Sequence, residues 1–335
     1  MRIHRLTWLI TMAVLCGASP AYAWGPDGHH TVAAIAVKLI SGTHAADQVK
    51  AILGDLSLTD AAVWADCAKG VSPTTFKYGG AGQFPECAIF ETPDGEAAME
   101  DFVRRNSTNC VIKPGEETCH KQYHYSDIAI QHMTYQATFV GARNDDIVAA
   151  VVATTHVLKG DPAPAPFNIK DKAEALRLLA HYAGDIHQPL HVGAVYLTAD
   201  GQVVNPDVGT FDPATSTRGG NSIKVLPSKS KNLHATWDAI PQSQTMTHIT
   251  AGWLAQARAV TPSAGSSLDW PAQWASGTVA QANAALSSLN FGPLSGGTWT
   301  VKLPQGYSTS MSAIKKKQLT LAGARLAQLL QDIWP

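Results

Sequence analysis

The sequence carries little charge, and neither sign predominates. Only 15% of its 335 residues are charged, and 25 basic residues against 26 acidic ones leave a formal net charge of −1. A protein that binds duplex nucleic acid through its surface normally has a clear excess of Lys and Arg. Because this excess is missing, any contact with nucleic acid must be local or be made through a bound metal ion.

Cysteine is also scarce, with five in the whole chain. Cys16 lies in the apolar N-terminal segment, and the other four do not have the spacing of a zinc finger. Four cysteines in an exported chain predict two disulfide bonds, for which three pairings are possible. The shortest loops would result from pairing Cys67 with Cys87 and Cys110 with Cys119, and this pairing is our expectation.

Long apolar runs are missing after the first 23 residues, so no later segment is predicted to span a membrane. Those first residues have the pattern of a signal peptide: Arg2 and Arg5 precede an apolar stretch, and Ala21-Tyr22-Ala23 has the small-x-small pattern of a cleavage site. An uncleaved anchor or a buried helix is the alternative, but either would need a longer apolar run. We therefore expect a signal peptide at 1–23 and a secreted or periplasmic protein that begins at Trp24.

Helical periodicity dominates the rest of the chain. Between residues 29 and 40, for example, Val32, Ile35 and Leu39 fall on one face. Asp171 and Glu174 have the spacing of a capping box, and Pro189 should stop the helix that they begin. The expected fold is a single, mostly α domain over residues 24–335, with many helices, long loops and little β structure. Helices are predicted at 29–40, 45–54, 59–66, 94–105, 145–160, 171–188, 246–260, 271–290 and 311–333, loops at 70–120 and 193–230, and a strand-like segment at 202–204.

Histidine is abundant, with 13 residues, and several lie at metal-ligand spacing from an aspartate. Residues four apart share one helix face, so a histidine and an aspartate at this spacing can hold one metal ion. A buried histidine with a carboxylate partner, or a solvent-facing pair, is the alternative for each pair alone. Together, the set exceeds what one zinc ion needs and favours several zinc ions bridged by carboxylates. The candidates are Asp66, His124, His181, Asp185, His191, His234 and Asp238.

Trp24 follows the cleavage site directly, and His29 lies five residues further on. A free α-amino group and the carbonyl oxygen of the same residue can form a five-membered chelate on a metal ion. Because the α-amino pKa is near 8, a cation readily displaces its proton. Export would then create a metal ligand at Trp24, close to His29. The alternative is that Trp24 is only a hydrophobic plug. The remaining histidines lack such spacing and are expected on the surface or in the core.

These fragments, in this order, resemble the S1/P1 nuclease family, whose members are zinc-dependent single-strand nucleases in a superfamily shared with zinc phospholipase C. The most specific match is the stretch AHYAGDIHQPLH at residues 180–191. The motifs extend from Trp24 to about residue 240, and the later helices fit the family only as α structure. The other matching fragments are WGxxGH at 24–29, WAD at 64–66, HYSD at 124–127, GGN at 219–221 and NLHATWD at 232–238.

The resemblance implies three Zn²⁺ ions. By position, Asp66, His124, His181 and Asp185 would hold the first. His191, His234 and Asp238 would hold the second, and with only three protein ligands it would keep open positions. The third would be held by the amino and carbonyl groups of Trp24, by His29 and by Asp185, which would bridge the first and third ions.

The resemblance also implies an endonuclease that cleaves single-stranded DNA and RNA to 5′-phosphate products and acts on 3′-nucleotides, working as a monomer. Asp66, Asp185 and Lys69 are the expected catalytic residues. Tyr125 and Asp127 match positions that bind a base beside the scissile phosphate, although Asp127 could instead orient a ligand histidine.

The resemblance leaves three points undecided: the contact with phosphate, the substrate preference and the class of function. Lys69 stands where the family often has an arginine that contacts phosphate, and Asn221 is expected to contact substrate. Lysine keeps the charge but loses the two-pronged contact. The loop at 193–218 is longer than in compact fungal members, so the substrate preference is open. A zinc-dependent phospholipase C and a non-catalytic zinc-binding protein are the alternative functions.

Overall fold

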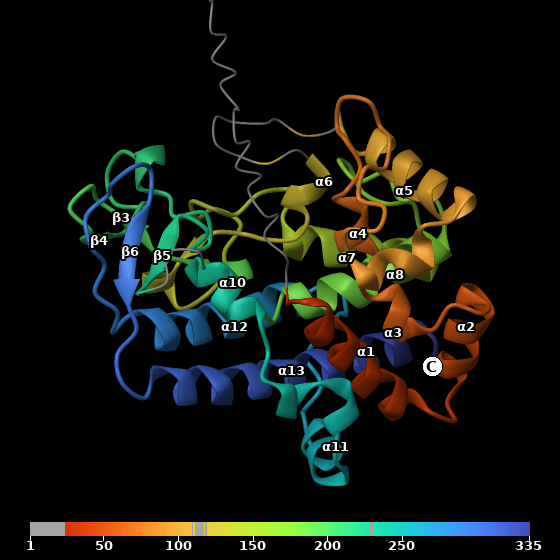
Figure 1. Ribbon diagram of the computed structural model, residues 1–335. Coiled ribbons are helices and arrows are strands. Elements are labelled where there is room, and N and C mark those ends of the chain that lie inside the picture. The colour runs from red at the N-terminus through yellow and green to blue at the C-terminus, as the bar shows by residue number, and fades with distance from the viewer. Residues whose placement is uncertain (1–23, 109, 111–116, 118, 228–230) are drawn as a thin grey trace, which may run out of the picture.

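The computed structural model describes residues 24–108, 110, 117, 119–227 and 231–335. The expected signal peptide lies outside these residues. Helices make up 52% of the structure and strands 8%, which confirms the mostly α fold (Figure 1). The α-helices are α1 (Pro26–Ile40), α2 (His44–Leu53), α3 (Leu58–Ala61), α4 (Trp64–Ala68), α5 (Pro93–Arg105), α6 (Cys119–Gln122), α7 (Ile147–Lys159), α8 (Lys172–Asp185), α9 (Pro189–Val192), α10 (Leu233–Asp238), α11 (Ala251–Arg258), α12 (Trp270–Leu286) and α13 (Tyr307–Ile333).

The strands are short and pair two by two. They are β1 (Ile128–Ala129), β2 (Gly193–Ala194), β3 (Tyr196–Leu197), β4 (Val203–Val204), β5 (Ile223–Leu226) and β6 (Trp299–Lys302). The strands β1 and β2 are parallel, as are β5 and β6, whereas β3 and β4 are antiparallel. Short 3₁₀ turns cover Pro85–Phe90, Ile130–His132, Pro213–Thr215, Gln242–Gln244 and Met246–His248.

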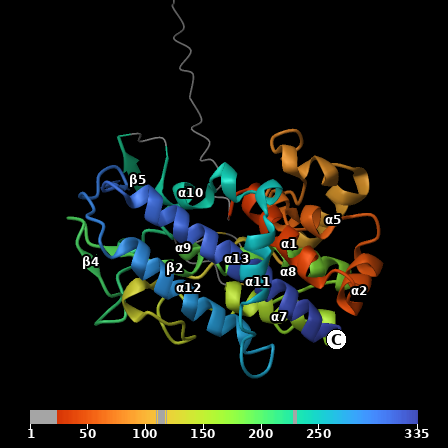
Figure 2. The same ribbon diagram turned by 90° about the horizontal axis from the view of Figure 1, so that it is seen from below.

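Helix α8 forms the centre of the fold, and every residue from Leu178 to Asp185 is buried. It packs against α7, α1 and α13, while α12 and α13 run side by side beneath it (Figure 2). Small residues permit these close contacts. A Cβ atom on Gly184 would lie only 2.8 Å from the ring of His29, so glycine allows α1 to approach α8 at this point. The expected metal ligands on α1 and α8 therefore lie where these two helices pack against each other in the core.

Two predicted helices are interrupted, one at a contact with a distant helix and one before a proline. The predicted helix at 59–66 divides into α3 and α4, because the carbonyl oxygen of Ala62 accepts a hydrogen bond from His181 Nδ1 at 2.7 Å. The helix that begins at Asp171 ends at Asp185, earlier than predicted, and Pro189 opens α9 instead. His191 therefore lies on a separate element from His181.

The predicted capping box is present only in part. Asp171 accepts a hydrogen bond from the Glu174 backbone N–H at 2.8 Å, as expected. The Glu174 carboxylate, however, accepts from the Lys170 N–H at 3.0 Å and pairs with Arg105 at 2.7 Å. The charge of Arg105 offers Glu174 a stronger partner than the backbone of the cap residue would.

The predicted helix at 246–260 begins only at Ala251, because a separate 3₁₀ turn covers Met246–His248. Other predictions agree with the structure. Both expected disulfide bonds are present, Cys67–Cys87 and Cys110–Cys119. The strand-like segment at 202–204 contains β4. Among the described residues, no helix combines the length and the apolar character that a bilayer crossing requires.

Candidate metal centre

Side chains from six segments of the chain converge on one buried site, and three of them, His124, His191 and His234, line a cavity. They come from α1, α4, the segment after α6, α8, α9 and α10. Their potential ligand atoms form three buried groups, and within each group all atoms lie within 4.8 Å of one another. The groups are His29, Asp66 and His181; His124, His181 and Asp185; and His191, His234 and Asp238.

Backbone contacts explain why distant segments meet here. The Ser126 N–H donates to the His191 carbonyl at 2.7 Å, and His191 Nδ1 donates to the His124 carbonyl at 2.7 Å. The parallel pair β1–β2 continues this contact. His124 and His191 are therefore locked side by side although 67 residues separate them.

The group around Asp185 has the dimensions of a tetrahedral metal site. Asp185 Oδ2 lies 2.9 Å from His124 Nδ1 and 3.1 Å from His181 Nε2. Asp66 Oδ1 lies 3.6 Å from His181 Nε2 and 3.9 Å from His124 Nδ1. Ligand bonds of about 2.0–2.1 Å in tetrahedral geometry place ligand atoms about 3.3 Å apart. The separations of Asp185 from the two histidines lie slightly below this value, and those of Asp66 lie above it.

The second group contains two histidines whose tautomers are fixed. The Nδ1 atoms of His191 and His234 face backbone carbonyls, of His124 at 2.7 Å and Gly219 at 2.8 Å. A carbonyl oxygen only accepts, so each neutral ring carries its proton on Nδ1. The Nε2 atoms, which then carry lone pairs, are 3.1 Å apart. Two lone pairs at this distance repel unless a cation lies between them.

Asp238 completes this group. Its Oδ2 lies 3.6 Å from His234 Nε2 and has no hydrogen-bond partner among the described residues, while Gln188 donates to its Oδ1 at 2.7 Å. Burial raises the pKa of Asp238 well above its ordinary value. A buried carboxylate oxygen beside two imidazole lone pairs is a donor set that suits a divalent cation such as zinc.

His29 provides the third position. It is fully buried, and neither ring nitrogen has a hydrogen-bond partner in the described part of the chain. Its ring stacks on His181 at 3.8 Å, and Nε2 lies 3.4 Å from Asp185 Oδ1, which is also unsatisfied. Because leaving buried polar atoms unsatisfied is costly, this arrangement also fits a bound cation.

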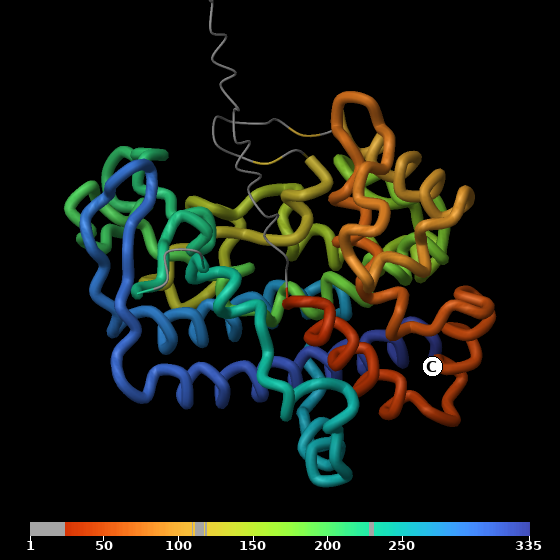
Figure 3. The backbone as a smooth tube through the Cα atoms, viewed as in Figure 1, coloured from red at the N-terminus to blue at the C-terminus, as the bar shows by residue number. Residues whose placement is uncertain are grey.

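The segment that leads into α1, at the beginning of the described chain, lies in the middle of the molecule (Figure 3). Trp24 in this segment approaches the same glycine of α8, Gly184, as His29 does. Its side chain is fully buried, and the indole Nε1–H donates to the Gly184 carbonyl at 2.9 Å. Gly25, the next residue, donates from its backbone N–H to the Asp238 carbonyl at 3.0 Å. The N-terminal residue of the expected mature chain is thus held between α8 and α10.

Burial keeps two of the histidines, His29 and His234, in the neutral form that binds metal. Burial lowers the pKa of His29 to about 4 and that of His234 to about 3, so both rings are neutral at physiological pH. For His181, burial lowers the pKa but the carboxylates of Asp185 and Asp66 outweigh it, and the pKa is raised. Neutral imidazoles and ionised carboxylates coordinate metal ions, so an ion that binds here displaces the protons that the raised pKa values of His181 and Asp238 favour.

Lys69 is the expected phosphate contact, and the structure places it against Asp66. Its Nζ lies 2.7 Å from Asp66 Oδ1, and only 8% of the side chain is exposed. Despite burial, the neighbouring carboxylates of Asp66 and Asp185 raise the pKa of Lys69, so the amine stays charged. Lys69 also lines the cavity, so its positive charge lies between the buried His and Asp groups and the space of the cavity.

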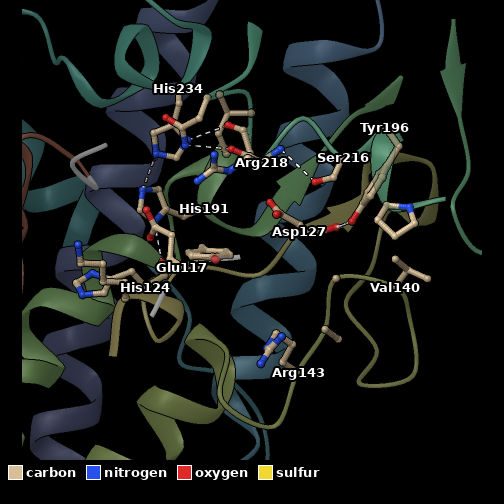
Figure 4. Close-up of a pocket in the computed structure, with 18 of the residues that line it drawn as sticks. Glu117, His124, Asp127, Val140, Arg143, His191, Tyr196, Ser216, Arg218 and His234 are labelled. Atoms are coloured by element: carbon tan, nitrogen blue, oxygen red, sulfur yellow. Dashed lines mark hydrogen bonds between the residues drawn. The ribbon is translucent and has the colours of Figure 1, made fainter. Parts of the chain in front are cut away.

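The cavity above the metal groups has a volume of about 510 Å³. His124, His191 and His234 lie along one side of it, Tyr196 and Val140 on the other, and Asp127 between them (Figure 4). Tyr125 and Asn221, both expected to contact substrate, line it as well. The Asn221 amide is already engaged: it donates to the Arg218 carbonyl at 3.0 Å and accepts from Asn232 at 3.3 Å.

The sequence alone did not indicate several residues of the site. Phe139, Tyr196, Phe211 and Arg218 line the cavity, but no motif or spacing marks them. Gln188 lies inside the most specific motif, yet its contact with Asp238 becomes visible only when α9 and α10 are placed together. For these residues the three-dimensional contact is the only signal.

Comparison with known proteins agrees with this geometry. A family model described as S1/P1 Nuclease matches residues 24–335. Endonuclease 1 of Arabidopsis thaliana is 27% identical over 243 residues, which cover 70% of this chain and 59% of that protein. Nuclease S1 of Aspergillus oryzae (strain ATCC 42149 / RIB 40) is 27% identical over 237 residues, which cover 68% of this chain and 58% of that protein. The matches thus span less than two thirds of these relatives, whereas the family model spans the whole described chain. On the strength of that match, the chain belongs to the S1/P1 nuclease family.

Proposed function

We propose that this chain is a zinc-dependent nuclease that hydrolyses phosphodiester bonds of single-stranded DNA and RNA, leaves 5′-phosphates and also acts as a 3′-nucleotidase. The observation that carries the proposal is the set of three neighbouring groups of buried His and Asp side chains, of which His124, His191 and His234 line one cavity. The names of the relatives, Endonuclease 1 and Nuclease S1, support the same activity. We expect the chain to act as a monomer.

We propose that three Zn²⁺ ions bind here, in keeping with the three groups of buried His and Asp side chains. Asp66, His124, His181 and Asp185 would hold the first ion, and His191, His234 and Asp238 the second. The amino and carbonyl groups of Trp24, with His29 and Asp185, would hold the third. The potential ligand atoms of His29, Asp66 and His181 lie close together, so the proposed sites of the first and third ions are adjacent. Bound zinc supplies Lewis acidity toward phosphate and makes water acidic enough to attack near neutral pH.

The protein's own residues position the substrate and hold the centre together. Asp185 presents Oδ2 to His124 and His181 and Oδ1 to His29, so one carboxylate can serve two ions. Lys69, which stays charged, provides a fixed positive charge where the scissile phosphate enters. Lysine acts here as a point charge and not as a two-pronged clamp.

Single-strand preference follows from the shape of the cavity. Its volume of about 510 Å³ is in the range that encloses one ligand of nucleotide size. A base can enter only after it has left the stack of a duplex, so an unpaired strand binds without the cost of unstacking. Tyr125 provides an aromatic face, and Asp127 provides an acceptor for a base edge. No broad basic groove is needed for this mode of binding.

We also propose that the protein works outside the cytoplasm, in the periplasm or the medium. Two disulfide bonds are typical of an oxidising compartment. Export with cleavage of the signal peptide after Ala23 would also free the amino group of Trp24.

The direct test is hydrolysis by the mature, zinc-loaded protein. Single-stranded DNA and RNA should release acid-soluble 5′-nucleotides much faster than duplex DNA, a zinc chelator should stop the release, and added zinc should restore it. Phosphatidylcholine should be turned over far more slowly. Preferential lipid turnover would instead indicate a phospholipase C, and zinc binding without hydrolysis of either substrate would indicate a non-catalytic metal protein.

Tyr125 should contribute base stacking and not proton transfer. Replacing it by alanine should raise KM for oligonucleotides about 5- to 150-fold, since stacking of one base contributes about 1–3 kcal/mol. Tyr125→Phe keeps the ring and is the matched control, which should stay close to the wild type. Steady-state kinetics on a short single-stranded oligonucleotide would measure both. Equal losses in the two variants would show that the hydroxyl group matters and not the ring.

A further inference from the structure

Lys315 is a buried lysine on α13, with only 2% of its surface exposed. Its Nζ donates to the Thr236 carbonyl at 2.8 Å and to the Ala239 carbonyl at 2.6 Å. It also lies 5.6 Å from the centre of the Trp237 ring. All three partners belong to the last turn of α10 or to the residue after it. Lys315 therefore caps the C-terminal end of the helix that carries His234 and Asp238.

Helix α10 depends on such contacts because it has only six residues. A helix of this length is not stable alone in water, so tertiary contacts must hold it. Asn232 caps its N-terminus by accepting from the Ala235 N–H. The last turn has no basic residue of its own, and its free carbonyls receive donors from elsewhere: Lys315 and the backbone of Gly25.

Burying a lysine at this place is unfavourable unless its charge is used. Burial lowers the pKa of Lys315 to about 8, which shows how poorly water solvates the ammonium group here. An apolar residue would fill the same space without this cost. The two short hydrogen bonds to carbonyls, at the negative end of a helix, are what the charge provides.

The same face of α13 also contacts His187, in the segment between the expected ligands Asp185 and His191. Gln318 donates to the His187 carbonyl at 2.7 Å, and Arg325 donates to His187 Nε2 at 3.0 Å. His187 lies between Asp185 on α8 and His191 on α9. One helix, distant in sequence from the ligands, thus contacts both segments that the second metal group joins.

We propose that Lys315 is a positioning residue of the metal centre: by holding the end of α10, it keeps His234 and Asp238 directed at His191. The inference rests on the proposed metal-binding role of this group. Lys315 itself contacts neither substrate nor metal. Its removal should therefore weaken one zinc site selectively and leave the group around His124 and His181 intact.

The test compares Lys315→Met, which keeps the volume, with Lys315→Arg, which keeps the charge and the donors. Lys317→Met is the matched control, because Lys317 is exposed on the same helix. Zinc affinity is measured by competition with a chromophoric chelator, and Co²⁺-loaded protein gives an absorption spectrum for the altered site. Lys315→Met should bind one of the ions about 10- to 100-fold more weakly, as is typical when a group that supports a ligand is removed.

Lys315→Met should also lower kcat more than it changes KM, while Lys315→Arg should restore most of the zinc affinity and Lys317→Met should match the wild type. If Lys315→Met does not fold, Lys315→Gln replaces it, since glutamine retains one donor group. Wild-type zinc affinity and Co²⁺ spectrum in the neutral variant would overturn the inference, and so would equal weakening of all the ions. Absence of zinc binding by the wild type would instead refute the proposed function.

Discussion

Replacing Asp185 by asparagine should reduce kcat/KM for single-stranded DNA by at least about a thousandfold, because it removes the carboxylate that would serve two metal ions. Asparagine has nearly the same shape, so the packing of α8 is preserved. Its amide nitrogen, however, would face His124, His181 or His29 where a negatively charged oxygen now lies 2.9–3.4 Å away. The variant should bind fewer zinc ions than the wild type.

Two measurements separate this effect from simple destabilisation. Zinc that binds only the folded protein raises its melting temperature by mass action, so the increase on adding zinc should be smaller in Asp185→Asn than in the wild type. Asp47→Asn, on the exposed face of α2, is the control and should retain full activity and zinc content. Normal zinc content with normal turnover in Asp185→Asn would exclude the proposed bridging role.

The local parts of this site could be predicted from the sequence, because helix geometry fixes them. A spacing of four residues predicted that His181 would face Asp185, and the structure places their nearest atoms 3.1 Å apart. His234 and Asp238 likewise lie 3.6 Å apart. Periodicity cannot indicate that these two pairs meet, since this depends on contacts between segments such as His124 with His191. That expectation came from the family resemblance.

Other features escaped prediction for the same physical reason. The division between α3 and α4 depends on the Ala62 carbonyl, which His181 occupies from another helix. Lys315 is 76 residues from Ala239, and nothing in its neighbourhood distinguishes it from Lys316 or Lys317 until α13 is packed against α10. Helix patterns specify which face is apolar, but not which polar side chain the packing will bury.

The N-terminus offers the sharpest test of the third metal position. A protein that keeps one extra residue before Trp24 should bind one zinc ion fewer and show about 100-fold lower kcat/KM. This loss is at the upper end of the range that is typical when a group supporting a metal ligand is removed. An extra residue converts the α-amino group into an amide, whose nitrogen is no longer basic and cannot coordinate zinc. Trp24 is fully buried, and Gly25 is bound to the Asp238 carbonyl, so the chain end cannot shift to offer another donor.

The matched control uses the same molecule before and after trimming. A removable leader, cut by a protease so that Trp24 becomes the first residue, should restore both zinc content and turnover. One residue added after Pro335, which is exposed, should change neither.

Melting temperatures of the metal-free forms show whether the extension merely disturbs packing. A packing defect would lower stability without zinc, whereas a lost ligand would lower only the stabilisation that zinc provides. Equal zinc content and equal turnover before and after trimming would show that Trp24 is a hydrophobic plug, and that the group around His29 is completed by Asp66, His181 and Asp185 alone.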